Sequence, residues 1–152
     1  MTTPLRCVVD ISVCIKHFIF DLLTLKVNQL FNHFAYRQTE IFVPDLFYIE
    51  CANTFWKYVR AGMCTNAEVQ ADLAILKALP LRVVSTANLM EEAVSIGLAH
   101  GISAYDASYV ALSQQVSATL VTLDQRLVNA LVNTAYDVCL FNNFKVPPLP
   151  SM

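Results

Sequence analysis

The chain has 152 residues, of which 56% are hydrophobic and only 14% are charged, against about 25% charged in an average soluble domain. This composition excludes a disordered or low-complexity chain, and the length suits one domain with a substantial core. The net charge of −2 excludes a strong overall basic field, so any contact with nucleic acid must be local.

The first half of the chain predicts two strands and two helices. Residues 6–10 (RCVVD) form a β-branched run that is typical of a buried strand. Apolar side chains at helical spacing predict a helix over residues 22–36, and IFV at residues 41–43 predicts a second strand. Pro44 and Asp45 then open a helix, which runs to about residue 60 and stops at Gly62.

The second half continues the alternation of helices and strands. Thr65 and Glu68 have the spacing of a capping box at a helix start, and His100-Gly101 has the pattern of a helix end. In order, the predicted elements are a helix at 65–79, a strand at 82–85, helices at 88–100 and 103–115, a strand at 119–123, a helix at 125–132 and a strand at 136–141.

Strands that alternate with helices predict an α/β fold with a mainly parallel sheet. The strands are short and almost uncharged, as expected when helices cover both faces of the sheet in a three-layer α/β/α arrangement. No repeat or linker interrupts the sequence, so we expect residues 1–145 to form one domain. The Pro-rich segment 146–152 (VPPLPSM) is predicted to be a loosely held tail.

Two further features bear on location and assembly. The most apolar stretch, residues 7–27, contains charged residues such as Asp10, Lys16 and Asp21, which argue against a membrane span and a signal peptide. The 5 cysteines form no C-x-x-C pair, so we expect reduced thiols in a cytoplasmic protein. The surplus of apolar residues favours an oligomer, in which a partner covers part of the surface.

Four acidic residues lie in apolar surroundings instead of on polar helix faces: Asp10 in CVVDIS, Glu50 in FYIECA, Asp106 in SAYDAS and Asp124 in VTLDQR. Asp10 and Asp124 end the two most apolar strands, and ligands of open α/β sheets bind at the carboxyl ends of strands. If those strands are neighbours, both carboxylates face one crevice. The helices that carry Glu50 and Asp106 are expected to start on the same rim.

Convergence of these acids would require a cation. Two carboxylates about 5 Å apart repel each other by roughly 3 kcal/mol at an effective dielectric constant near 20. Oxygen-only ligands suit Mg²⁺ or Mn²⁺, whereas Zn²⁺ favours His and Cys. The 3 histidines form no ligand-spaced pair. The acids therefore predict a Mg²⁺ or Mn²⁺ site.

Each acid also has a purely structural interpretation. Asp106 can complete a capping box with Ser103, Asp124 can cap the helix that follows it, and Asp10 can bond into an Asp-x-Ser turn. Glu50 lies within a helix and has no capping role. One shared site explains all four acids more simply than separate roles do.

Several polar and basic residues are candidates for supporting roles. Asn53 lies three residues after Glu50 and shares its helix face. Ser12 and Thr122 place hydroxyls beside the acids at the two strand ends, where they suit a hydrogen bond to a metal-bound water or to a metal-binding carboxylate. Lys16 and Arg126 are candidates for holding substrate phosphates, and for Lys57 and Arg60 a solvated helix surface is the simpler interpretation.

In order and spacing, four segments resemble the conserved blocks of PIN-domain ribonucleases, above all the VapC-type toxins of toxin–antitoxin modules. They are VVDISVCIK (8–16), PDLFYIECAN (44–53), GISAYDASYVALS (101–113) and TLVTLDQRL (119–127). By this resemblance, Asp10, Glu50, Asp106 and Asp124 match the acidic quartet of the family. Ser12, Asn53 and Thr122 match its accessory polar positions.

The resemblance implies a PIN-like fold and a metal-dependent endoribonuclease. One or two Mg²⁺ or Mn²⁺ ions would bind the scissile phosphate and generate hydroxide for in-line attack. The RNA would be single-stranded or in a loop. The resemblance also implies a homodimer and a small antitoxin partner whose C-terminal segment enters the acidic groove.

Two other functions remain open at this point. A PIN-like module that binds RNA or protein without cleaving it would share the fold, although the intact acids argue against it. A receiver-type phosphoacceptor also carries acids at strand ends, but it usually has paired acids after its first strand and a lysine after a late one. The sequence has Asp10-Ile-Ser and TLDQR at these places, which makes a receiver the weaker interpretation.

Overall fold

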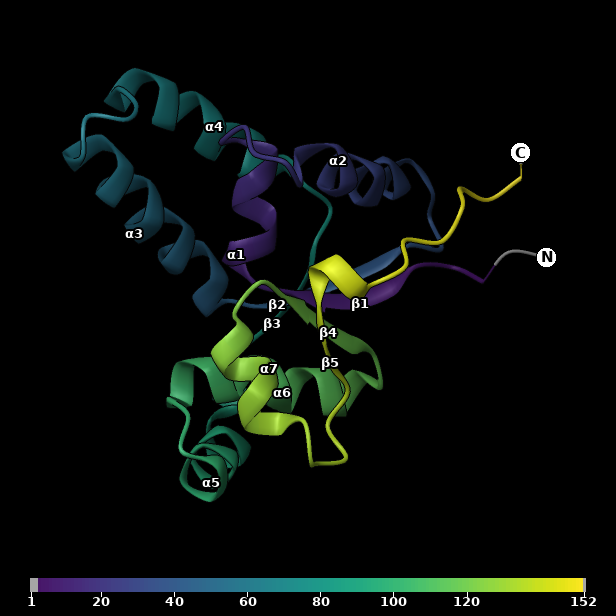
Figure 1. The fold of residues 1–152 in the computed structure, drawn as a ribbon. Helices are drawn as coiled ribbons and strands as arrows, with labels where there is room; N and C mark the ends of the chain where they lie inside the picture. Colours follow the sequence, from purple (N-terminus) through teal and green to yellow (C-terminus); the bar gives the residue numbers. More distant parts are fainter. Residues whose placement is uncertain (1–2, 152) are drawn as a thin grey trace.

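A five-stranded sheet lies at the centre of the computed structural model, which describes residues 3–151 (Figure 1). All neighbouring strands are parallel, in the order β3-β2-β1-β4-β5. The strands are β1 (Arg6–Val9), β2 (Glu40–Pro44), β3 (Arg82–Val84), β4 (Thr119–Thr122) and β5 (Val138–Leu140). The two most apolar strands, β1 and β4, are therefore direct neighbours, with Val8 opposite Leu120.

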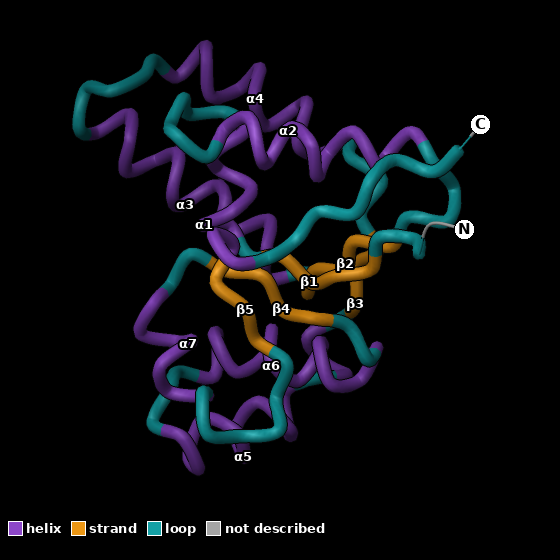
Figure 2. Tube along the Cα trace, turned by 45° about the vertical axis from the view of Figure 1, so that its right-hand side comes forward, coloured by secondary structure: helices purple, strands orange, loops and turns teal. Residues whose placement is uncertain are grey.

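Helices cover both faces of this sheet. They are α1 (Ile11–Cys14), α2 (Thr24–Asn32), α3 (Leu46–Arg60), α4 (Asn66–Ala78), α5 (Met90–His100), α6 (Ala104–Val116) and α7 (Gln125–Leu131). Figures 1 and 2 show α1 to α4 on one side of the sheet and α5 to α7 on the other. The predicted three-layer α/β/α fold is confirmed.

The core explains why the strands are so apolar. Val8, Val9, Leu120 and Val121 are fully buried because helices pack on both faces of the central strands. The middle of α6, residues 107–113, is buried, since this helix packs on the sheet on one side and against α5 on the other. Edge strand β3 is the exception, with an exposed Val83.

Most elements lie where the sequence predicts them, and the differences are local. Thr65 and Glu68 form the predicted capping box of α4, and Gly101 ends α5 in the left-handed region with φ of 67°. Pro44 is the last residue of β2, so it does not open α3. The short helix α1 was not predicted, and the helix expected over 22–36 divides into α2 and a 3-10 turn over His33–Ala35.

The first residues of the C-terminal segment contact the domain. Val146 packs against the main core. The buried His33 ring donates from Nε2 to the carbonyl oxygen of Pro147 at 2.8 Å. Because a carbonyl oxygen only accepts, this contact fixes the Nε2–H tautomer. The beginning of the segment is thus attached to the domain beside α2.

Two further observations concern the thiols and the apolar character of the helices. All 5 cysteines lie in the described part of the chain and are free, and three of them, Cys7, Cys14 and Cys51, are buried. Between residues 3 and 151, no helix is both long and apolar enough to cross a lipid bilayer.

Candidate active site at the carboxyl edge of the sheet

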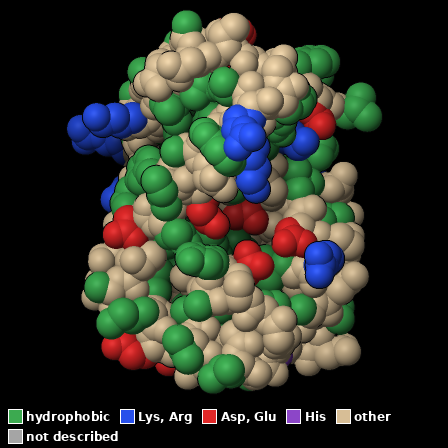
Figure 3. Space-filling model, turned by 90° about the vertical axis from the view of Figure 1, so that its left-hand side faces the viewer, with side chains coloured by type: hydrophobic (Ala, Val, Ile, Leu, Met, Phe, Trp, Pro, Cys, Tyr) green, Lys and Arg blue, Asp and Glu red, His purple; other side chains and the backbone are tan. Residues whose placement is uncertain are grey.

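The four predicted acids lie at or near one edge of the sheet. Asp10 directly follows β1, and Asp124 comes two residues after the end of the neighbouring strand β4. Glu50 lies in the second turn of α3, and Asp106 lies in the first turn of α6. Figure 3 shows acidic side chains gathered around a hollow across this face, with Lys and Arg side chains above and beside them.

Hydroxyl groups from both central strands hold the Asp10 carboxylate. Its Oδ1 accepts from the backbone N–H of Ser12 at 3.1 Å and from the Ser12 hydroxyl, and its Oδ2 accepts from the Thr122 hydroxyl at 2.5 Å. The Thr122 oxygen also accepts from the N–H of Asp124 at 3.0 Å, and the Ser12 oxygen accepts from Leu123 N–H at 2.9 Å. The hydroxyls of Ser12 and Thr122 therefore join the ends of β1 and β4.

The environment of Asp10 disfavours its charged form despite these bonds. Burial raises its pKa above the usual value, and the hydrogen bonds from Ser12 and Thr122 oppose that rise. The Asp-x-Ser turn is present, because Asp10 caps α1 through Ser12. The turn alone does not account for a buried carboxylate, since an uncharged Asn or Ser would cap the same helix.

Glu50 is bound by a residue that the sequence reading did not identify. The Tyr109 hydroxyl donates to Glu50 Oε1 at 2.5 Å, and Tyr109 itself is only 3% exposed. Burial raises the pKa of Glu50, the charges of Asp10 and Asp106 raise it further, and the Tyr109 bond lowers it. In sequence, Tyr109 is one of several apolar positions of α6, and nothing there distinguishes its hydroxyl from an ordinary core tyrosine.

Asp106 and Asp124 combine capping with mutual repulsion. Asp106 N–H donates to the Ser103 hydroxyl at 3.1 Å, but the carboxylate does not complete the capping box. Burial raises the pKa of Asp106, and the charge of Asp124 raises it further. Asp124 does cap α7, through Oδ1, which accepts from the N–H groups of Arg126 at 3.0 Å and Leu127 at 3.3 Å. Its Oδ2 accepts no hydrogen bond from the described residues.

Electrostatic coupling connects the four acids in a chain of pairs. Asp10 and Asp106 both act on Glu50, and Asp124 acts on Asp106. Within residues 3–151, however, no three acidic, histidine or thiol side chains stand close enough to form a complete metal cage. The donors are all oxygen atoms, and their mutual repulsion would be relieved by a cation. Their chemistry thus fits a hard divalent ion.

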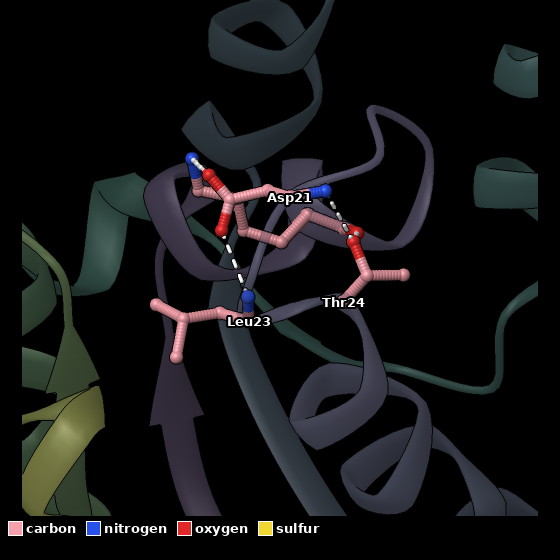
Figure 4. Close-up of polar contacts among 4 residues, drawn as sticks. Asp21, Leu23 and Thr24 are labelled. Atoms are coloured by element: carbon pink, nitrogen blue, oxygen red, sulfur yellow. Dashed lines mark hydrogen bonds and ion pairs between the residues drawn. The ribbon is translucent and has the colours of Figure 1, made fainter.

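The candidates for supporting roles, Asn53, Lys16 and Arg126, lie in different surroundings. Asn53 and Glu50 together line a hollow of about 420 Å³ beside α3. The ammonium of Lys16 forms an ion pair with the carboxylate of Asp21, with an N–O distance of 2.9 Å. Figure 4 shows that Asp21 also accepts from Leu23 N–H and donates its own N–H to Thr24. The Lys16 ammonium thus has an acidic partner, whereas Arg126 is exposed beside Asp124.

Comparison with known proteins identifies relatives of the whole domain. The model of the PIN domain family matches residues 7–130. Ribonuclease VapC3 of Pyrobaculum aerophilum is 37% identical over 90 residues, which cover 58% of this chain and 69% of that protein.

Solved structures share the fold at lower identity. A Pyrobaculum aerophilum protein superposes with a TM-score of 0.68 at 21% identity and covers 88% of this chain and 83% of its own. Mycobacterium tuberculosis VapC20, described as a toxin that cleaves the sarcin–ricin loop, gives 0.60 at 20% identity, covering 83% and 95% of the two chains. A toxin–antitoxin complex from Klebsiella pneumoniae gives 0.58 at 12% identity, covering 88% and 96%.

Proposed function

The chain belongs to the PIN-domain family, as a VapC-type member, and from this premise we propose that it is an endoribonuclease that uses Mg²⁺ or Mn²⁺ to hydrolyse RNA phosphodiester bonds. The observation that carries this proposal is the set of four acids, Asp10, Glu50, Asp106 and Asp124, at the carboxyl edge of the sheet. Burial raises the pKa of three of them, and carboxyl groups with perturbed pKa values cluster at functional sites.

The side chains have distinct roles in this proposal. The four carboxylates would hold a divalent cation, which would supply positive charge near the scissile phosphate and acidify a water molecule. Asp10 is fixed on both oxygens by Ser12 and Thr122, so it provides a rigid ligand. Glu50 is held at Oε1 by Tyr109 and keeps Oε2 for the cation. Asp124 is held at Oδ1 and keeps Oδ2.

The proposal includes RNA as substrate and a protein inhibitor as partner. The relative named Ribonuclease VapC3 supports RNA, and the solved Klebsiella toxin–antitoxin complex supports an antitoxin. An arginine of such a partner would complement the acidic hollow, because it neutralises carboxylates by bidentate hydrogen bonds. We extend the proposal to a cytoplasmic homodimer, since RNA and antitoxin meet the protein in that compartment and apolar side chains remain exposed on α5.

The decisive experiment compares wild type with Asp10→Asn on a mixed pool of structured RNA. The protein is first freed of any small partner, and each reaction is run with Mg²⁺, with Mn²⁺ and with EDTA. Asp137→Asn is the matched control, because Asp137 is an exposed carboxylate at the opposite, amino end of β5. We expect cleavage by wild type and control only with metal, and none by Asp10→Asn.

Cleavage that persists in EDTA, or that Asp10→Asn retains, contradicts the proposal. Calorimetry decides the remaining case, in which no RNA is cut. If folded wild type cuts nothing and also binds neither Mg²⁺ nor Mn²⁺, the chain is a PIN-like binding module and the acids are structural.

A further inference from the structure

One exposed face of α3 leads away from the acidic hollow and has an unusual composition. At about 100° per residue, Glu50, Asn53, Trp56, Lys57 and Arg60 fall within an arc of about 120°; we name these five residues the α3 track. The opposite face of α3 carries Phe47, Cys51 and Phe55, which are all fully buried. The α3 track is therefore the solvent side of an amphipathic helix, but it is not simply charged.

The middle of the track presents an exposed aromatic ring. Trp56 is the single tryptophan of the chain, and 53% of its surface is accessible. The Arg60 guanidinium lies over its ring, 5.0 Å from the centroid. Proteins that bind single-stranded nucleic acid stack unpaired bases on aromatic rings and place basic side chains, such as arginine, beside the phosphates.

The basic residues of the track lie at one end and its acidic residue lies at the other. Lys57 and Arg60 are exposed, and neither forms an ion pair with any residue between 3 and 151. Glu50 belongs to the acidic hollow at the other end, about 15 Å away along ten residues of helix. Asn53 lies between them. Polyanionic RNA would meet attraction at one end and the cleavage site at the other.

The track opens into a cavity at the acidic end. Glu50 and Asn53 line the hollow of about 420 Å³ together with Ile49 and with Tyr105 from α6. Tyr105 is 65% exposed and Ile49 is 67% exposed. A second aromatic ring thus stands across the hollow from the track. Figures 1 and 2 show α3 rising from the edge of the sheet, so the track extends outward from the hollow.

We propose that the α3 track guides single-stranded RNA into the acidic hollow, with Trp56 stacking on a base and with Lys57 and Arg60 neutralising phosphates. This inference rests on the proposed ribonuclease function and names the surface that the substrate uses. The charges favour RNA over a protein partner, because Lys57 and Arg60 are two exposed cations without an acidic partner among the described residues, and such cations bind phosphates. A duplex does not fit, because its paired bases leave no free face for Trp56.

The single tryptophan allows a direct binding experiment. The probe is an unstructured RNA oligonucleotide, added to the Asp10→Asn chain in EDTA so that the RNA stays intact. We expect the fluorescence of Trp56 to be quenched on binding, and the same sequence as a blunt duplex to quench it little. Fluorescence anisotropy of labelled RNA then gives the affinity of variants that lack the tryptophan.

Variants separate stacking from charge. We expect Trp56→Ala to weaken RNA binding about tenfold and, in the active chain, to raise KM with kcat within about twofold. The double variant Lys57→Gln/Arg60→Gln removes two phosphate contacts, so the slope of log affinity against log salt falls by about 1.4. The matched control is Arg37→Gln/Lys77→Gln, which removes two exposed cations outside the track and leaves that slope unchanged.

Three results would overturn the inference: equal binding of duplex RNA, no effect of Trp56→Ala, or a change of oligomeric state in both track variants by sedimentation. The last result would make the face a protein interface. If wild type cleaves RNA with metal while the track variants behave as wild type, the inference about the track is wrong and the proposed ribonuclease function stands. If RNA quenches the fluorescence of Trp56 but wild type cleaves no RNA, the proposed ribonuclease function is wrong and RNA binding at the track stands.

Discussion

At the scale of single residues, Tyr109 is a core side chain that forms a hydrogen bond with one of the four acids. It is buried on α6 and yet donates a hydrogen bond to Glu50 on α3, so it fixes the carboxylate without being exposed to substrate. Groups that orient a metal-binding carboxylate typically change metal affinity or activity 10- to 100-fold when they are lost. Tyr109 is therefore a positioning residue for the proposed metal site.

Tyr109→Phe tests this role with a minimal change of volume. We expect the fold to persist, Mn²⁺ affinity to fall about tenfold or more, and RNA cleavage to fall with it. Removal of the donor also raises the pKa of Glu50 further. Calorimetric titration with Mn²⁺ measures the effect, and Tyr105→Phe serves as the control, because Tyr105 is an exposed tyrosine of the same helix. Unchanged Mn²⁺ affinity in Tyr109→Phe would show that the bond only supports packing.

The raised pKa of Asp106 predicts how the stability of the metal-free protein depends on pH. Because burial and Asp124 raise the folded-state pKa, the folded state binds more protons than the unfolded state above about pH 4. The contribution of Asp106 is thus fully present below its unfolded pKa and is lost as the pH rises through its folded pKa. Asp21 has the opposite sign, since Leu23 N–H and Lys16 lower its pKa.

Urea unfolding in EDTA at pH 4.5 and pH 8, values chosen on either side of the expected window, measures this difference. We expect Asp106→Asn to be more stable than wild type at the higher pH and to show a weaker dependence on pH. Asp21→Asn, the contrasting variant, should be less stable than wild type at that pH. Mg²⁺ should stabilise wild type by mass action and should stabilise Asp106→Asn less. Parallel pH profiles for wild type and Asp106→Asn would refute the assignment.

The sequence predicts acids better than it predicts their partners. Asp10 and Asp124 follow apolar strands, and the rule that ligands bind at strand ends places both at one edge once the strands are neighbours. Tyr109 was missed, because a tyrosine at an apolar helix position gives no sign of what its hydroxyl meets. The ion pair of Lys16 with Asp21 gives no sign in the sequence either, since it depends on the turn between the two residues.

At the scale of elements, periodicity identifies long helices and fails for short ones. Helices α3, α4, α5 and α6 each span three turns or more, so the apolar spacing is repeated enough to be read. Helix α1 has four residues and gives no period; it exists because Asp10 caps it. Pro44 lies at the end of a strand because its missing N–H is tolerated there, an alternative that a Pro-Asp pair does not reveal.

The contacts of the C-terminal segment can be tested by truncation. Composition alone predicts a loose tail, yet Val146 packs on the core and Pro147 accepts from His33. We expect truncation after Lys145 to lower the free energy of unfolding by about 1–2 kcal/mol, because a buried donor loses its acceptor. Urea denaturation measures it. Truncation after Leu149 keeps both contacts and should cost little; equal losses in the two truncations would mean that the contact with His33 does not matter.

At the scale of the whole molecule, the apolar surplus is visible on the surface of α5. Met90, Val94 and Leu98 recur every four residues and are 57%, 52% and 83% exposed. They form a continuous apolar stripe on one side of the helix. The hollow between α5 and the start of α6, about 200 Å³, extends it. Such stripes on soluble domains usually mark a protein interface.

The proposed homodimer would use this stripe, and a paired substitution tests it. In a two-fold interface each side chain faces the partner's copy of the same surface, so Val94→Glu/Leu98→Glu places like charges opposite each other. We expect wild type to sediment as a dimer and the variant as a monomer. Because both positions are exposed in the single chain, the stability of the monomer should change by about 0.5 kcal/mol or less. Leu25→Glu, at a 74% exposed leucine of α2, should leave the dimer intact. A wild type that sediments as a monomer at high concentration would leave the α5 stripe for the antitoxin.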